Sequence, residues 1–101
     1  MAVYIIAQID IHDRAEYDKY QAGFLEIFSL YAGELLVVSE DAQVVEGEWP
    51  YTRTVLIRFR SAEEARRWYE AREYQALAQH RFRASRANVV MAEALPDMGP
   101  V

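Results

Sequence analysis

Cysteine is absent from the 101-residue sequence. The chain therefore has no disulfide bond, no thiolate nucleophile and no cysteine ligand for zinc or an iron–sulfur cluster. Histidine is nearly as rare, with only His12 and His80, far apart in the sequence. Two distant histidines do not make a zinc site, so we expect no metal and no cofactor. A haem needs a single histidine, which leaves His80 open as an axial ligand.

Glycine and long apolar runs are also scarce. The four glycines form neither a phosphate-binding loop nor a dinucleotide-binding fingerprint. No apolar stretch is long enough to cross a membrane, and residues 1–7 carry no positively charged leader. We therefore expect no membrane partner and a cytoplasmic location.

Basic residues are outnumbered, with eleven against sixteen acidic ones and a net charge of −5. Proteins that bind nucleic acid normally carry the opposite sign, because neutralising phosphates supplies most of their affinity. The acidic excess lies in residues 1–50, whereas residues 51–101 are net positive. This asymmetry fits either complementary faces that meet in an assembly or charge scattered over the surface. We expect no nucleic-acid partner.

Apolar residues make up 52% of the chain and aromatic residues 13%, which is too many for a disordered protein. The length suits one domain. We predict a single domain over residues 1–95 and a C-terminal tail over residues 96–101, where Pro96 and Pro100 prevent regular structure.

The apolar pattern predicts both strands and helices. Alternation predicts strands at residues 3–10, 35–38, 53–59 and 88–95, with a further extended stretch at 44–47. Apolar residues at steps of three and four predict a long helix that begins after Asp13 and is stopped by Gly33. A second helix begins after Ser61, and residues 73–83 form a further helical stretch. Glu16 and Glu64 stand three residues after the two N-cap residues, as in capping boxes.

This order, β-α-β-β-α-β, predicts an α+β fold of the ferredoxin-like type, with a four-stranded antiparallel sheet and the helices on one face. The strands are apolar on both sides, as Tyr4 and Ile6 opposite Val3 and Ile5 illustrate. A monomer would leave the second face of the sheet in water. We therefore expect a homodimer in which two sheets pack together.

The sequence also resembles the family called domain of unknown function 1330, of the dimeric α+β-barrel superfamily. The resemblance covers nearly the whole chain and rests on Tyr20, Gly33, Glu46-Gly47-Glu48-Trp49-Pro50, Arg53, Phe59, Ala65, Trp68-Tyr69, Glu73-Tyr74-Gln75 and Arg81. It implies the ferredoxin-like fold and a dimeric α+β barrel, but no activity. The superfamily includes cofactor-free monooxygenases, lactone isomerases and haem enzymes, among which a fold does not choose.

Two positions depart from the family pattern. Ala71-Arg72 stands where the family usually has Ser-Pro, so no serine hydroxyl is expected in the pocket. Ala94 replaces the usual glycine at the end of the last strand, which implies a local difference in the backbone.

Two arginines are candidates for binding an anion. Arg53 begins an apolar strand and can fork onto a carboxylate or enolate, and Arg81 can converge on the same cleft. Alternatively, Arg53 forms a structural ion pair with Glu46 or Glu48. Glu46 is the best carboxylate candidate, acting either as a base if buried or as an inert partner of Arg53.

Aromatic residues are the other candidates for ligand binding. Trp49, Tyr69 and Tyr74 can line a flat aromatic pocket, whereas Trp68 is expected in the core. Neither histidine has a visible partner that would orient it as a base. The catalytic residues, if the protein is an enzyme, are not identified.

Two functions follow from these residues. The first is a small homodimer that binds an anionic or aromatic metabolite between the sheet and the helices. The alternative is a cofactor-independent oxygenase or isomerase acting on an enolisable or aromatic substrate, in which the protein orients the substrate and an arginine stabilises the oxyanion.

Overall fold

The computed structural model describes residues 1–96. Seven elements follow one another: β1 (Val3–Ile11), α1 (Arg14–Phe28), β2 (Glu34–Ser39), β3 (Arg53–Phe59), α2 (Ala62–Tyr69), α3 (Arg72–Ala84) and β4 (Ser85–Glu93). The strands form one antiparallel sheet in the order β2-β3-β1-β4. The predicted ferredoxin-like α+β fold is confirmed, with the last helical region divided into α2 and α3. Of the predicted tail, residues 97–101 lie outside the described residues.

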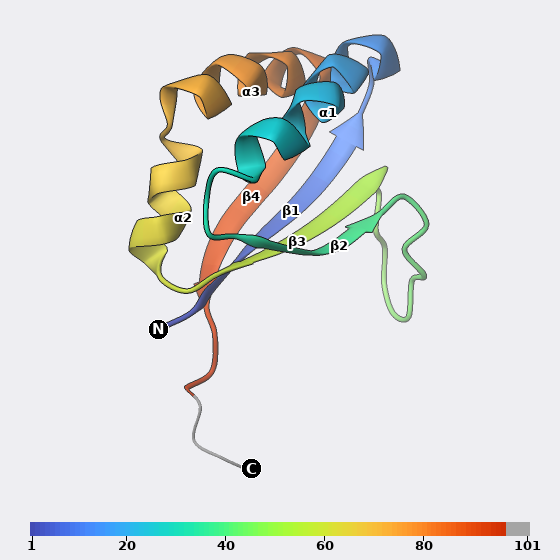
Figure 1. Cartoon of the computed structure of the whole chain (residues 1–101). Coiled ribbons are helices and arrows are strands. Elements are labelled where there is room, and N and C mark those ends of the chain that lie inside the picture. Colours follow the sequence, from blue (N-terminus) through green and yellow to red (C-terminus); the bar gives the residue numbers. More distant parts are fainter. Residues whose placement is uncertain (97–101) are drawn as a thin grey trace.

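All three helices cover the same face of the sheet, and the opposite face is open (Figure 1). The alternation in β1 sets this arrangement, because Val3, Ile5, Ala7 and Ile9 are buried while the residues between them are half-buried. The covered face packs against aromatic side chains of the helices, chiefly Tyr17, Tyr20, Phe28, Trp68 and Tyr74. The core is therefore one apolar layer between the sheet and the helices. Within residues 1–96 no helix has the length and apolar character needed to cross a membrane.

The predicted helix starts are confirmed. The side chain of Asp13 accepts a hydrogen bond from the Glu16 backbone N–H at 3.2 Å, and Ser61 does the same for Glu64 at 3.1 Å. The capping box predicted for this first helix also requires the Glu16 carboxylate to accept a hydrogen bond from the Asp13 backbone N–H, and this part of the prediction is wrong. The Glu16 carboxylate turns to His80, while the Asp13 N–H donates to the Ala84 carbonyl.

The expected end of α1 at Gly33 is also wrong, because α1 ends at Phe28 and Gly33 does not have a positive φ. Glycine is needed there for space. A Cβ at this position would lie 2.5 Å from the Phe28 ring and 2.8 Å from the Phe59 ring. Gly33 therefore lets the chain pass close to the aromatic core.

Two other boundaries differ from the sequence prediction. Residues 44–47 are not extended strand but part of an exposed loop between β2 and β3, in which Gly47 has a φ of +82°. The last strand begins at Ser85 rather than at residue 88, because its ladder with β1 runs from Ile11↔Ser85.

Candidate functional site

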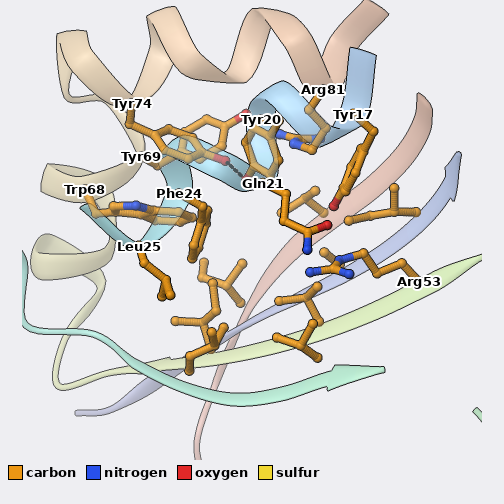
Figure 2. Close-up of a pocket in the computed structure, with 18 residues that line it drawn as sticks. Tyr17, Tyr20, Gln21, Phe24, Leu25, Arg53, Trp68, Tyr69, Tyr74 and Arg81 are labelled. Atoms are coloured by element: carbon orange, nitrogen blue, oxygen red, sulfur yellow. Dashed lines mark hydrogen bonds between the residues drawn. The ribbon is translucent and has the colours of Figure 1, made fainter. Parts of the chain in front are cut away.

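A cavity of about 310 Å³ lies between the sheet and the helices. Its volume falls at the lower end of the range of small-molecule sites. Inward-facing side chains of all four strands form its floor, and α1, α2 and α3 form its roof (Figure 2). Among the residues first proposed from the sequence, the cavity brings together Arg53, Tyr69, Tyr74 and Arg81.

Arg81 is the most unusual residue of the cavity. Tyr74, Ala78, Arg81 and Ala84 recur at steps of three and four along α3, so Arg81 lies on the buried face of the helix between two small alanines. The residue is only 5% exposed. Its guanidinium carbon lies 5.6 Å from the centre of the Tyr20 ring and 5.0 Å from that of Phe82. Among residues 1–96, no carboxylate forms an ion pair with it.

Arg53, in contrast, has a counterion. Its Nη1 donates to Glu40 at 2.8 Å, and Glu40 also accepts two hydrogen bonds from Arg14. The hydrogen bond from Arg14, with a smaller contribution from Arg53, lowers the pKa of the Glu40 carboxyl below its ordinary value. The predicted pairing of Arg53 with Glu46 or Glu48 is therefore wrong, and the partner is Glu40.

Tyrosine hydroxyls supply the remaining polar groups. The hydroxyls of Tyr20 and Tyr74 are hydrogen-bonded at 2.8 Å, and the Tyr17 hydroxyl points toward Arg53 (Figure 2). Burial raises the pKa of both Tyr17 and Tyr20 above the ordinary value of 10. These two hydroxyls therefore stay protonated at neutral pH, and that of Tyr20 is engaged with the hydroxyl of Tyr74.

Two of the proposed residues are not part of the cavity lining. Trp49 donates its indole N–H to the Thr54 hydroxyl at 3.0 Å. Since Thr54 alternates with the cavity residues Arg53 and Val55 along β3, Trp49 lies by the open face of the sheet. Glu46 is exposed in the loop between β2 and β3.

The histidines also lie outside the cavity lining. His80 contacts the Glu16 carboxylate through Nδ1 at 2.7 Å, and Arg83 donates to the same carboxylate oxygen at 2.9 Å. This polar cluster joins α1 to α3 and leaves His80 without a role in the cavity. Within residues 1–96, no group of three or more acidic or histidine side chains is arranged to hold a metal ion.

Among the cavity residues that the sequence did not single out as ligand-binding candidates, four carry a polar group. Tyr17, Tyr20, Gln21 and Trp68 line the cavity, although the apolar stripe of α1 and the expected core position of Trp68 pointed only to packing. Trp68 is 2% exposed, so its core position is confirmed as well. The signal available in the sequence was the hydroxyl carried by two residues of the stripe, since tyrosine brings a polar group to a buried position.

Comparison with known proteins identifies the family. The pattern of a domain of unknown function, DUF1330, matches residues 2–95. The chain belongs to the DUF1330 family. No curated protein matches the sequence.

Solved structures similar to this DUF1330 chain share little sequence with it. A protein of unknown function from Rhodopseudomonas palustris, RPA0582, superposes with a TM-score of 0.76 at 10% identity, covering 93% of this chain and 82% of that one. SnoaB, a cofactor-independent oxygenase from Streptomyces nogalater, superposes with a TM-score of 0.67 at 14% identity, and the alignment covers 98% of both chains. HapK from Hahella chejuensis superposes with a TM-score of 0.63 at 14% identity, and the alignment again covers 98% of each chain. At these identities the likeness shows the ferredoxin-like α+β fold alone.

Proposed function

We propose that this DUF1330 protein binds a small anionic aromatic molecule in the cavity between its sheet and its helices. The observation that carries the proposal is the buried guanidinium of Arg81, which has no counterion among the described residues. A buried charge is costly unless it is paired, so such a cation calls for an anion. A carboxylate can accept two parallel hydrogen bonds from a guanidinium.

The walls of the cavity fit an aromatic ring. Tyr20, Phe24, Trp68, Tyr69 and Tyr74 all line it. Aromatic pairs favour stacked or edge-to-face contacts, which a flat ligand can make with several of these side chains.

The cavity supports binding better than catalysis. Among the described residues that line it, none is a histidine, an aspartate or a glutamate. Burial keeps Tyr17 and Tyr20 protonated at neutral pH, so neither is ready to accept a proton from a substrate. The alternative of an oxygenase or isomerase gains no support from these side chains, and we put forward binding alone.

Titration calorimetry with benzoate and 2-naphthoate tests this proposal. We expect both acids to bind the protein, and Arg81→Met to lower their affinity by at least tenfold, as expected for a charged hydrogen bond worth about 1.5–3 kcal/mol. Arg72→Met is the matched control, because Arg72 is an exposed arginine on the same helix. Absence of binding, or equal losses in the two variants, would contradict the proposal.

We also propose that two copies pack through the open faces of their sheets. The side chains of Tyr4, Ile6, Val37, Leu56 and Val90 point to this face, as their pairing across the strands shows. Packing of two such sheets would bury about 1,200–2,000 Å², the size of a stable interface.

Analytical ultracentrifugation tests the dimer. At micromolar concentration we expect about twice the 11.7 kDa of the chain. Leu56→Arg, at the centre of the face, should shift the protein to the monomer, whereas Leu30→Arg, exposed elsewhere, should not. A wild-type monomer would refute this assembly. The cytoplasmic location stays a prediction from the sequence.

A further inference from the structure

The cavity extends across the whole width of the sheet. It is lined by Val38 of β2, Val55 of β3, Ala7 of β1 and Val89 of β4. Because β2 and β4 form opposite edges of the sheet, the cavity spans three gaps between strands. At about 4.8 Å per gap, its long dimension is about 14 Å. This exceeds the length of a single aromatic ring with its carboxylate.

The two ends of this elongated cavity differ in chemistry. Arg81 marks the β4 end, because it also borders a second hollow of about 380 Å³ together with Ser85, Ala87 and Val89, three residues of β4. At the β2 end the lining residues are Leu25, Leu35 and Val38.

The β2 end is open to solvent. Leu25 is 65% exposed, and Leu35 and Val38 are 37% and 44% exposed although both face the helical layer. The helices therefore stop short of covering β2. The opening is aliphatic, whereas the cation lies at the opposite edge of the sheet.

Between the two ends the roof is aromatic. The ring centroids of Trp68 and Tyr74 lie 4.4 Å apart, and the Phe24 ring is edge to face with that of Trp68 at a centroid distance of 6.2 Å. Arg53 borders the cavity as well, but its charge is paired with Glu40. Along the cavity the order is thus a cation, aromatic rings and an aliphatic opening.

We propose, on the basis of the proposed function, that the ligand is an aryl carboxylate with an apolar substituent opposite its acid group. Its carboxylate binds Arg81, its ring lies against Trp68 and Tyr74, and its substituent extends between Leu25 and Val38 toward solvent. A ligand with charge at both ends is disfavoured, because the second charge would lie among aliphatic side chains.

A series of 4-alkylbenzoates, from benzoate to 4-hexylbenzoate, tests this orientation by calorimetry. We expect affinity to rise about threefold to fourfold for each methylene that is buried. Terephthalate, which carries a second carboxylate in place of the alkyl group, should bind at least tenfold more weakly than 4-ethylbenzoate.

Variants at the opening locate the substituent. In Leu25→Gln and Val38→Thr, affinity should increase less with the length of the alkyl substituent than it does in the wild type. Leu30→Gln is the matched control, since Leu30 is exposed but lies outside the cavity lining, and it should keep the full rise.

The outcomes separate this inference from the proposed function. Equal affinities along the series, or tighter binding of terephthalate, would overturn the orientation while leaving the anion site intact. An unchanged rise in Leu25→Gln and Val38→Thr would also overturn it. Failure of every carboxylate to bind would instead refute the proposed function itself.

Discussion

Replacing Arg81 with methionine should leave the fold as stable as before or make it more stable. Arg81 is 5% exposed and forms no ion pair with any residue from 1 to 96. Keeping a charge in such a place costs several kcal/mol, even after relaxation and entry of water. Its contacts with the Tyr20 and Phe82 rings return about 0.5–2 kcal/mol each.

Methionine keeps an unbranched apolar side chain in the same place and removes the charge. The free energy of unfolding should therefore be unchanged or raised by up to about 2 kcal/mol, within the range seen when buried charges are replaced by apolar groups. In a domain of this size, each kcal/mol corresponds to a shift of about 4–8 °C in the melting temperature. Urea unfolding and thermal melts, both at one fixed protein concentration, measure the change.

Arg53→Met is the comparison variant. Glu40 is 36% exposed at its side chain and keeps its contact with Arg14, so removal of Arg53 does not leave a buried, unpaired carboxylate. We expect a loss below about 1 kcal/mol, because Glu40 is partly exposed and stays paired with Arg14. The reasoning is refuted if Arg81→Met loses more than about 1 kcal/mol, since the buried charge would then be structural.

Three further predictions concern other parts of the fold. Contacts with His80, Arg83 and Lys19 lower the pKa of Glu16 to about 2 from the ordinary 4.5, so its stabilising effect is present above pH 4.5 and is lost as the pH falls toward 2. The stability difference between wild type and Glu16→Gln should therefore vanish in acid melts, and a constant difference would contradict this. Gly33→Ala should cost about 1–3 kcal/mol in urea unfolding through overpacking, whereas Gly23→Ala, which meets only the flexible end of Leu77, should cost less. Trp49→Phe should leave benzoate affinity unchanged in calorimetry, because Trp49 lies by the open face of the sheet, and a large loss would return it to the site.

The sequence predicted the elements whose pattern is local. Alternation in residues 53–59 gave β3 with its observed bounds, and Asp13 and Ser61 marked the helix starts because a cap depends only on residues a few positions away. These predictions needed no knowledge of how strands pair.

The partner of Arg53 could not be predicted in this way, because it depends on a bulge. The register of β2 shifts between Leu35 and Val37, which inserts Leu36 as an extra residue. Every later side chain in the strand then changes face, and Glu40 comes to lie beside Arg53 on the side of the cavity. The sequence does not indicate this change, because residues 35–38 are all apolar and either alternation would place apolar side chains toward the helices.

The sequence predicted only that Arg81 could reach the same cleft as Arg53. The absence of a counterion for Arg81 within residues 1–96 is a property of the packed fold, because an acidic residue could have reached it in another arrangement. The same holds for Trp49, which a loop between strands can place on either face of the sheet.

A crystal structure of the protein with 4-butylbenzoate tests the central claim most directly. The account predicts the carboxylate within hydrogen-bond distance of the Arg81 guanidinium, with the ring against Trp68 and Tyr74. A ligand bound elsewhere, or a protein carboxylate already paired with Arg81, would contradict it.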